Sequence, residues 1–302
     1  TLSETAQRGA LWRALRPHQW VKNLLLLAPV RLTHRALEER GPLLAAGVAA
    51  LCFSAVASAG YLLNDWLDRE ADRQHPSKRN RPLASGALSE ARAAAAFGLL
   101  LAGAAAVSLA WLPVGFSALL VIYFGLTVAY SVDLKRRVVV DVLVLAALYT
   151  LRILAGGTAA QVPISPWLLV FSMFFFLSLA FVKRYAELLG AQADRKDKLA
   201  RRGYEVGDIG LVENMGTTSG YLSVLVLALY VSSDTVETLY GGGTLLWGIC
   251  PIMLFWVTRI WFLARRGELE DDPVLFAATD PVPSRSGAAI ARREAEPAAA
   301  CS

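Results

Sequence analysis

Long apolar runs recur along the whole sequence, and they limit the architectures that the chain can adopt. A helix crosses the hydrocarbon core of a bilayer with ~20 mostly apolar residues, and backbone groups in lipid must be hydrogen-bonded within their own segment. Of the 302 residues, 55% are hydrophobic and only 18% are charged, below the roughly 25% of soluble domains. We therefore expect an all-α, polytopic transmembrane helical bundle. The eight expected spans are residues 22–37, 43–64, 93–111, 114–131, 138–156, 165–183, 217–233 and 244–264, of which the first is short and weakly apolar.

Lysine and arginine are distributed unevenly over the loops that join these runs. Sixteen of them lie in the three loops after the second, fourth and sixth runs, whereas the alternate loops 112–116, 157–166 and 232–243 contain none. Because cytoplasmic loops retain Lys and Arg, these three loops are expected to face the cytoplasm, in a bacterial-type inner or plasma membrane. Three arginines within 31–42 break the pattern, but the other loops agree. The net charge of +5 then belongs to loops at a membrane, and we expect no nucleic-acid partner.

The cysteines, the histidines and the C-terminal segment do not indicate a metal site or a catalytic site. The three cysteines have no metal-ligand spacing, and the three histidines have no nucleophile or metal partner nearby in the sequence. Neither a P-loop nor a G-x-S-x-G pattern is present. The sequence after residue 267 is acidic and then rich in Pro and Ala, which is typical of disorder. We expect one transmembrane domain over residues 1–266 and a polar, disordered tail over 267–302.

The stretch YLLNDWLDREADRQHPSKRNRPLASG, residues 61–86, brings dense charge to the end of the second run. If the helix continues, Asp65, Asp68 and Asp72 are spaced i, i+3 and i+7 and share one face, with Asn64 beside them. Clustered oxygen atoms are the ligands that Mg²⁺ prefers, and the ion commonly bridges to phosphate. The alternative is a solvated helix end whose aspartates pair with neighbouring arginines.

Basic residues follow the aspartates directly. Lys78, Arg79 and Arg81 suit a phosphate or diphosphate ligand, although a positive-inside loop would also explain them. In YSVDLKRR, Tyr130 precedes Lys135, which stands where a helix meets the cytoplasm. Lys135 is either a phosphate ligand or a snorkelling anchor, and the sequence leaves both open.

Charged residues also occur within the later runs or at their ends. Asp141 and Arg152 are 11 residues apart, about three helical turns, and so share a face. Ionisable groups inside a span are costly and usually functional, which favours a site-lining or packing role over snorkelling for Arg152. In FVKRYAELL, Lys183, Arg184 and Glu187 either form helix-surface ion pairs or face a phosphate.

The segment NDWLDREAD matches the N-D-x-x-D-x-x-x-D motif of the UbiA superfamily of intramembrane prenyltransferases, and HPSKRNRPLASG resembles the segment that follows it there. RPHQWVKN, YSVDLK, RILAGG and KRYAEL are similar to the decaprenyl-phosphate phosphoribosyltransferase branch. The resemblance extends from Arg16 to Asp280. It implies a UbiA-like transferase with a cytoplasm-facing polar cavity, a lateral opening to lipid and, usually, nine spans.

The resemblance also implies roles for individual residues. Asn64, Asp65, Asp68 and Asp72 would hold Mg²⁺ on a diphosphate, and the three aspartates would be the catalytic residues. The resemblance further implies phosphate-binding roles for Lys78, Arg79, Arg81, Lys135, Lys183 and Arg184. The other substrate-binding candidates, taken from the charged and polar patterns alone, are Tyr130, Asp141, Arg152 and Glu187. The implied partners are an isoprenoid lipid, a diphosphate-bearing donor and the membrane lipids.

Two departures from the family pattern matter. Aromatic prenyltransferases carry a second aspartate-rich motif after the sixth helix, where this chain has KRYAELL with Glu187 as its only carboxylate. This favours Mg²⁺-dependent transfer of phosphoribose from phosphoribosyl diphosphate to polyprenyl phosphate. The alternatives are transfer of a prenyl group from an allylic prenyl diphosphate to an aromatic or other small acceptor, terpene cyclisation, and a non-enzymatic lipid transporter. The usual ninth span is also not expected after residue 267, because the tail is polar, so either the bundle has eight spans or a partner fills the gap.

Overall fold

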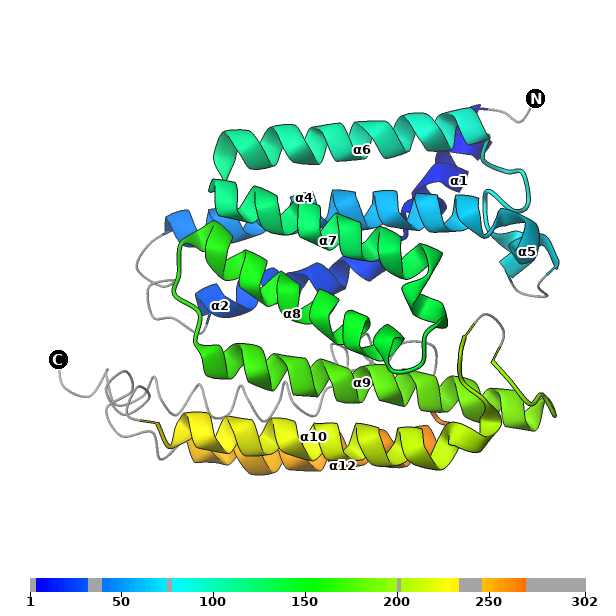
Figure 1. The fold of residues 1–302 in the computed structure, drawn as a ribbon. Helices are drawn as coiled ribbons and strands as arrows, with labels where there is room; N and C mark the ends of the chain where they lie inside the picture. The colour runs from blue at the N-terminus through cyan, green and yellow to red at the C-terminus, as the bar shows by residue number, and fades with distance from the viewer. Residues whose placement is uncertain (1–3, 32–39, 75–77, 200–201, 234–245, 270–302) are drawn as a thin grey trace. The chain divides into compact units, whose positions relative to one another are not determined.

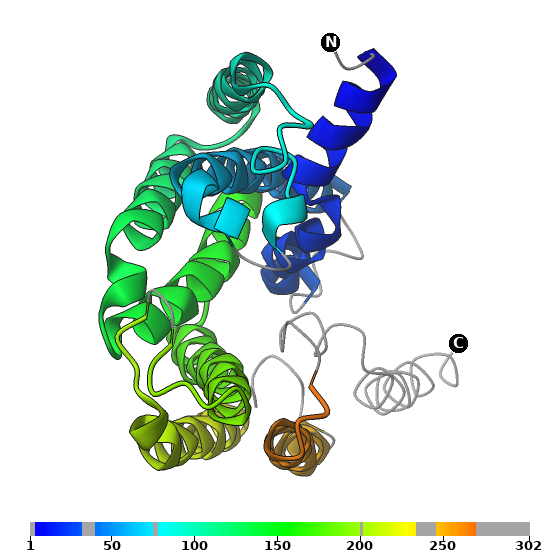
Figure 2. The ribbon, with the colours of Figure 1, turned by 90° about the vertical axis from the view of Figure 1, so that its right-hand side faces the viewer.

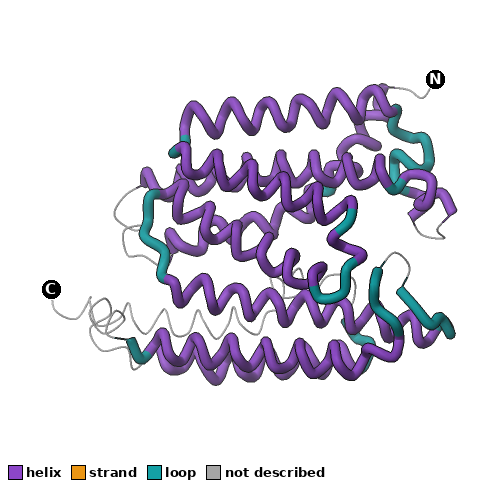
Figure 3. Tube along the Cα trace, viewed as in Figure 1, coloured by secondary structure: helices purple, strands orange, loops and turns teal. Residues whose placement is uncertain are grey.

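The computed structural model describes residues 4–31, 40–74, 78–199, 202–233 and 246–269 (Figure 1). Helices make up most of this part of the chain, and the described residues form no strand beyond an isolated bridge between Lys198 and Glu205 (Figure 3). The expected all-α bundle is therefore confirmed. The helices divide into two compact units, residues 1–135 with 151–164 and residues 136–150 with 165–302.

The first unit is built around α4 (Arg40–Leu67), whose apolar span is 56% buried. The helices that pack on it are α1 (Glu4–Leu15), η1 (Pro17–Leu27), α6 (Glu90–Trp111) and α7 (Val114–Val132). In Figure 2, α6 is seen nearly end-on and α1 from the side. Its shorter elements are α2 (Ala28–Arg31), α5 (Arg69–Gln74) and η2 (Lys78–Asn80), and η3 (Leu134–Arg136) follows α7. Small residues on α4 allow α7 to approach it closely, since a Cβ added to Gly60 would lie 2.9 Å from the side chain of Thr127.

The second unit is built from α9 (Pro166–Ala193), α10 (Ile209–Val231) and α12 (Ile249–Arg265), with η4 (Val206–Asp208) and η5 (Leu246–Gly248) before the last two. Ser178 lies where the three long helices meet. Its hydroxyl donates to the carbonyl oxygen of Gly216 at 2.7 Å and accepts from the indole N–H of Trp261 at 3.1 Å. The remaining helix, α8 (Val140–Ala160), contributes its first half to this unit and its second half to the first unit.

Local sequence explains where several helices begin. The Ser89 side chain accepts a hydrogen bond from the backbone N–H of Arg92 and so caps α6. Pro113 separates α6 from α7, and Pro166 occupies the first turn of α9, where its missing N–H has no helical partner to lose. These residues divide the apolar sequence into separate helices.

Among the residues that the structure describes, seven helices are long and apolar enough to cross a membrane: Arg40–Leu67, Glu90–Trp111, Val114–Val132, Val140–Ala160, Pro166–Ala193, Val206–Val231 and Leu246–Arg265. The sequence predicts eight, and the difference is the weak first run, 22–37. Up to residue 31 this run lies in η1 and α2, and its remainder lies outside the described residues. The expected tail lies almost wholly outside them too, and the polar cavity stays a prediction.

The length of α4 places its charged end outside the hydrocarbon. Its 28 residues span about 42 Å at 1.5 Å each, against a hydrocarbon core of ~30 Å. The apolar part of the helix can therefore cross the bilayer while the motif that begins at Asn64 reaches the headgroups and water.

Candidate active site

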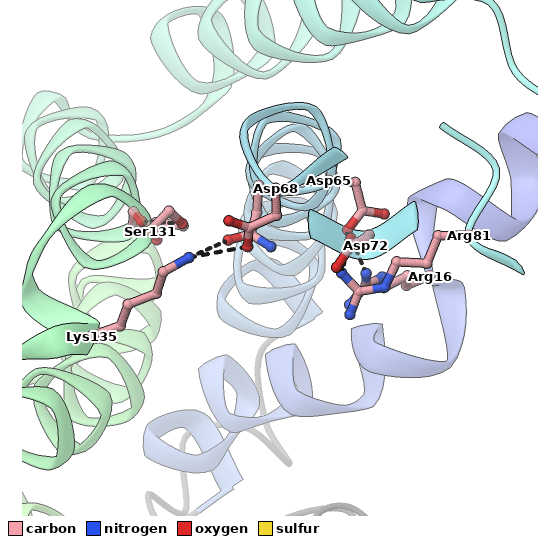
Figure 4. A network of polar contacts seen from close by, with 9 residues as sticks. Arg16, Asp65, Asp68, Asp72, Arg81, Ser131 and Lys135 are labelled. Atoms are coloured by element: carbon pink, nitrogen blue, oxygen red, sulfur yellow. Dashed lines mark hydrogen bonds and ion pairs between the residues drawn. The ribbon is translucent and has the colours of Figure 1, made fainter. Parts of the chain in front are cut away.

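Asp65, near the end of α4, is the centre of a group of ion pairs in the first unit (Figure 4). Its Oδ1 atom lies 2.7 Å from Arg16 Nη2 and 3.1 Å from Arg81 Nη1. The same Arg81 nitrogen lies 2.8 Å from Asp72 Oδ2. Asp65 and Asp72 are 2% and 4% exposed, whereas the two arginine side chains are each 25% exposed. Two buried carboxylates therefore converge on one cationic nitrogen at the edge of the solvent.

A second group of polar contacts surrounds Lys135, which η3 carries just after α7. Its Nζ atom lies 3.1 Å from Asp68 Oδ2 and 3.4 Å from Asn64 Oδ1 (Figure 4). Lys135 is only 7% exposed. A snorkelling anchor would keep its ammonium group in water, so these contacts favour the site role over the anchoring role.

Helical geometry explains why the motif divides into two groups. Asp65 belongs to α4 and Asp72 to the short helix α5, and both lie against the same Arg81 nitrogen. Asp68 is about 60° from Asp65 but only about 40° from Asn64, and so it faces Lys135 with Asn64. This differs from the expectation that all three aspartates share one face. The helix is interrupted at Asp68, a turn residue between α4 and α5, although Asp68 N–H still donates to Asn64 O and Asp72 N–H to Asp68 O, both at 2.9 Å.

The arginines between the aspartates pair with other residues. Arg69 contacts Glu70 and Glu90, and Arg73 lies 3.0 Å from Glu70. These contacts differ from the alternative in which neighbouring arginines neutralise the aspartates. Arg73 Nε also donates to the carbonyl oxygen of Ala84 at 3.1 Å, which ties α5 to the turns that follow Arg81.

Arg16 is the member of the site that the sequence motifs do not point to. It lies 49 residues before Asp65 and immediately precedes η1, in a left-handed conformation with φ 51° and ψ 58°. Its guanidinium carbon lies 5.0 Å from the ring centroid of Tyr61, within cation–π range. The available signal is that Arg16 opens the segment RPHQWVKN, which resembles the phosphoribosyltransferase branch, but nothing in that segment indicates a contact with Asp65.

The oxygen atoms of the motif suit a divalent cation in chemical type. Mg²⁺ is usually bound through one or two carboxylates, with water and substrate phosphates completing its coordination. Asp65 and Asp72 already share one cationic nitrogen, so they fit such a two-carboxylate site. Across the part of the chain that the structure describes, no group of three or more His, Cys, Asp or Glu side chains is arranged to hold a metal ion.

Four other predicted residues of this set are placed as follows. Lys78 and Arg79 are exposed in η2, and Tyr130 in α7 and Lys183 in α9 are half-buried. Their roles as substrate ligands stay predictions.

The second unit contains its own buried ion pair. Arg184 is 0% exposed; its Nη2 atom lies 2.8 Å from Asp141 Oδ2, and its Nη1 atom contacts Glu187. The Tyr204 hydroxyl donates to Asp141 Oδ1 at 2.8 Å and accepts from the backbone N–H of Val139 at 2.9 Å. Burial raises the pKa of the Tyr204 hydroxyl above its ordinary value, and the adjacent Asp141 carboxylate raises this pKa further. Arg184 and Glu187 are thus engaged with neighbours in this structure.

Arg152, by contrast, belongs to a polar cluster inside the first unit. Its Nε atom donates to Asn23 Oδ1 at 2.9 Å, and its Nη2 atom donates to the Tyr123 hydroxyl at 2.7 Å. All three residues are buried. Asp141 and Arg152, which were expected to share a face of one helix, therefore have separate sets of partners.

Comparison with known proteins identifies the group to which this arrangement belongs. Residues 33–279 match the UbiA prenyltransferase family. The chain belongs to this family. It is accordingly an integral-membrane transferase, and the non-enzymatic transporter alternative is not supported.

Several known proteins resemble the chain in sequence. It is 38% identical over 270 residues to nodulation protein NoeC of Azorhizobium caulinodans, covering 88% of this chain and 86% of NoeC. It is 36% identical over 228 residues to a decaprenyl-phosphate phosphoribosyltransferase of Mycolicibacterium smegmatis, covering 74% of this chain and 71% of that enzyme. It is also 38% identical over 279 residues, 92% of this chain, to the y4nM protein of Sinorhizobium fredii, but spans only about half (54%) of that protein's length.

Solved UbiA structures share the fold. A homologue from Archaeoglobus fulgidus bound to DMAPP and Mg²⁺ matches the chain with a TM-score of 0.70 at 18% sequence identity. The match covers 93% of this chain and 96% of that chain. At this identity the similarity confirms the UbiA fold.

Proposed function

We propose that this UbiA protein transfers phosphoribose from phosphoribosyl diphosphate to a polyprenyl phosphate at the cytoplasmic face of a bacterial inner membrane. The observation that carries the proposal is the convergence of Arg16 and Arg81 on Asp65 and Asp72 at the end of α4. With Asp68 and Lys135 beside them, three cations and three carboxylates lie together. Guanidinium and ammonium groups bind phosphate oxygens, and carboxylates bind the cation that accompanies a diphosphate.

Two observations favour phosphoribose over a prenyl group. The Mycolicibacterium smegmatis relative at 36% identity is named a decaprenyl-phosphate phosphoribosyltransferase. In addition, KRYAELL lacks a second aspartate cluster, and its one carboxylate, Glu187, contacts Arg184. One acidic motif suits a reaction in which a single substrate carries a diphosphate and the lipid carries a monophosphate.

The proposed reaction forms one bond and breaks one. An oxygen of the lipid phosphate attacks the anomeric carbon of the ribose, and the bond from that carbon to the diphosphate oxygen breaks. The electron pair of the broken bond leaves with the diphosphate. The lipid phosphate is already ionised at neutral pH, so the protein need not supply a general base.

The basic residues would carry most of the catalytic effect. Arg16 and Arg81 would bind the diphosphate and stabilise the negative charge that develops on it as it leaves, which is a large contribution in transfers of this kind. Lys135 would bind the phosphate of the second substrate. Bringing two anions together in a partly buried site requires these cations, because like charges repel strongly where water is scarce.

Asp65 and Asp72 would hold Mg²⁺, with Asn64 and Asp68 as further candidates. When bound, the ion neutralises charge on the diphosphate and makes it a better leaving group. The A. fulgidus homologue, which is bound to DMAPP and Mg²⁺, supports a divalent cation in this family.

The experiment offers purified protein two sets of substrates in the presence of Mg²⁺. One reaction contains phosphoribosyl diphosphate and polyprenyl phosphates of several chain lengths, and the other contains prenyl diphosphates and aromatic acceptors. Lipid-linked phosphoribose in the first reaction, abolished by a chelator, is the expected result. A prenylated acceptor in the second, with no lipid-linked sugar in the first, would overturn the proposal in favour of prenyl transfer.

A further inference from the structure

A line of polar contacts runs through the first unit from Arg152 toward Arg16. We propose that Arg152 and Asn23 are positioning residues, which fix η1 against α4 and thereby hold Arg16 on Asp65. This rests on the proposed function, because it treats Arg16 as a ligand of the diphosphate.

The first contacts join α8, η1 and α7. Arg152 of α8 donates to Asn23 of η1 at 2.9 Å and to the Tyr123 hydroxyl of α7 at 2.7 Å. Its guanidinium carbon lies 4.8 Å from the Tyr123 ring centroid. Arg152, Asn23 and Tyr123 are 6%, 2% and 3% exposed. An arginine that is buried in a membrane-spanning helix is costly, so its retention calls for a specific role.

The next contacts attach η1 to α4 along one face. Asn23 Nδ2 donates to Ser54 Oγ at 3.0 Å, and Trp20 Nε1 donates to Ser58 Oγ at 3.0 Å. Ser58 Oγ donates in turn to the carbonyl oxygen of Leu15, also at 3.0 Å. Ser54 and Ser58 are one helical turn apart. The backbone is thus held on both sides of Arg16.

Asp65 lies on the same face of α4, farther along the helix. It is seven residues beyond Ser58, which places it about 20° away around the axis and about 10 Å along it. A segment that follows this face from Ser54 to Ser58 therefore points its preceding residue, Arg16, toward Asp65. The 2.7 Å contact between Arg16 Nη2 and Asp65 Oδ1 is the end of that line.

Gly156 of α8 lies directly against η1. It follows Arg152 by four residues on α8, so both face the same way. A Cβ added to Gly156 would lie 2.0 Å from the carbonyl oxygen of Leu26 in η1. One turn of α8 therefore donates a hydrogen bond from Arg152 to Asn23 and has no side chain at Gly156, where Leu26 approaches. These two contacts together fix the register of η1 against α8.

The conformation of η1 makes such support necessary. It is an 11-residue 3₁₀ helix, whereas runs longer than about four residues are uncommon because their hydrogen bonds have poorer geometry. Arg16 adds to this cost, since a residue other than glycine is disfavoured at positive φ. Side-chain contacts must hold both the helix and the residue before it, and loss of these contacts would move Arg16 without touching the site.

A double-mutant cycle tests the proposal, with kcat/KM for phosphoribosyl diphosphate as the readout. Arg152→Met alone is expected to lower this value by about 10- to 100-fold, as misplacement of a substrate-binding group does, while the KM for polyprenyl phosphate is unchanged. In an Arg16→Gln background, Arg152→Met is expected to change it by less than about twofold. Equal losses in both backgrounds would overturn the proposal, because they would show that Arg152 does not act through Arg16.

Two further variants keep the test decisive. Arg92→Met removes an exposed arginine of α6 by the same substitution, and it should leave every kinetic constant near the wild-type value. Ser58→Ala breaks the contacts to Trp20 and Leu15 without removing a charge, so it serves if Arg152→Met fails to fold. It should reproduce the same non-additivity with a smaller loss; additive losses would count against the proposal.

The same double-mutant cycle can be measured without turnover, with calorimetry of the binding of inorganic diphosphate and Mg²⁺ as the readout. Weaker binding in Arg152→Met, and no further weakening when Arg16 is already changed, is the expected result. If Asp65→Asn and Arg16→Gln both bind and turn over like the wild type, the proposed function itself fails. If those two lose binding but Arg152→Met has an independent effect, only this inference fails.

Discussion

Lys135 Nζ lies 3.1 Å from Asp68 Oδ2, which joins two residues that are 67 positions apart in the sequence. Both belong to short motifs that look separate in the sequence, NDWLDREAD and YSVDLKRR. The contact makes the turn after α7 a part of the same site as the end of α4. The consequences of this arrangement can be tested residue by residue.

Substitution of Asp65 or Asp72 should lower turnover far more than substitution of Glu70, an acidic residue that lies between them in the sequence. Asp65→Asn or Asp72→Asn keeps the shape of the side chain but removes a charge that Arg81 contacts. Either change should lower turnover by at least ~100-fold, the scale of losing one electrostatic group at a reacting centre. Glu70→Gln is the matched control, because Glu70 is 71% exposed on the same short helix. Near-normal rates for both aspartate variants, measured on folded protein, would remove the metal-site assignment.

Loss of Lys135 should also impair catalysis. Lys135→Met leaves the Asp68 carboxylate, 18% exposed, without its ammonium partner. Hydrogen bonds to charged groups contribute about 1.5–3 kcal/mol, so kcat/KM should fall by roughly 10- to 100-fold. Arg136→Met, on the exposed neighbour, should have little effect. Equal kinetics for the two variants would indicate that Lys135 only anchors the turn.

The sequence predicts the class of fold and the core of the site because both depend on short-range periodicity. Apolar runs of spanning length can only be helices in lipid, and the seven-residue spacing predicts that Asp65 and Asp72 lie together if one helix continues. The structure brings these two aspartates together on Arg81 although α4 ends between them. The three-residue spacing misleads, since the offset of about 60° lets Asp68 face Lys135 instead. The weak first run has too few apolar positions to predict its 3₁₀ conformation.

Contacts between side chains that are far apart in the sequence could not be predicted from local sequence patterns. Arg16 reaches Asp65 only because η1 follows one face of α4, and this path depends on contacts from α8. The sequence of α9 leaves open whether Arg184 faces a phosphate, but in the structure Asp141 of α8 pairs with it. Side-chain partners of this kind follow from tertiary structure.

The contact between α8 and η1 predicts a steric effect on stability. Gly156→Ala would place a methyl group 2.0 Å from the carbonyl oxygen of Leu26, so the backbone must move. The variant should lose about 1–3 kcal/mol of stability, the usual cost of overpacking, and melt at a lower temperature in detergent. Gly103→Ala in α6 is the control, because a Cβ there meets no atom within 4 Å. Equal melting temperatures would contradict the close approach of η1 to α8.

The buried tyrosine of the second unit predicts a dependence of stability on pH. The pKa of the Tyr204 hydroxyl is raised above its ordinary value of 10.0, first by burial and then by Asp141. Above pH 10 the unfolded chain therefore loses this proton before the folded chain does. The free energy of unfolding should fall as the pH rises from 10 toward the raised pKa, and this contribution is constant below pH 10.

Tyr204→Phe separates this contribution from those of other tyrosines. At pH 8 the variant should be less stable by about 1–3 kcal/mol, because Asp141 Oδ1 and the N–H of Val139 lose a buried partner. Above pH 10 its stability should decline less steeply than that of the wild type, so that the difference narrows. Denaturant unfolding at pH 8 to 11 measures both effects, with Tyr221→Phe, at an exposed position on α10, as the control.

Since Val139 has a φ of 66°, which is unfavourable for a β-branched residue, the hydroxyl of Tyr204 also stabilises a strained turn. If the free energies of unfolding of Tyr204→Phe and the wild type change in parallel with pH, the Tyr204 hydroxyl does not stabilise the turn at Val139.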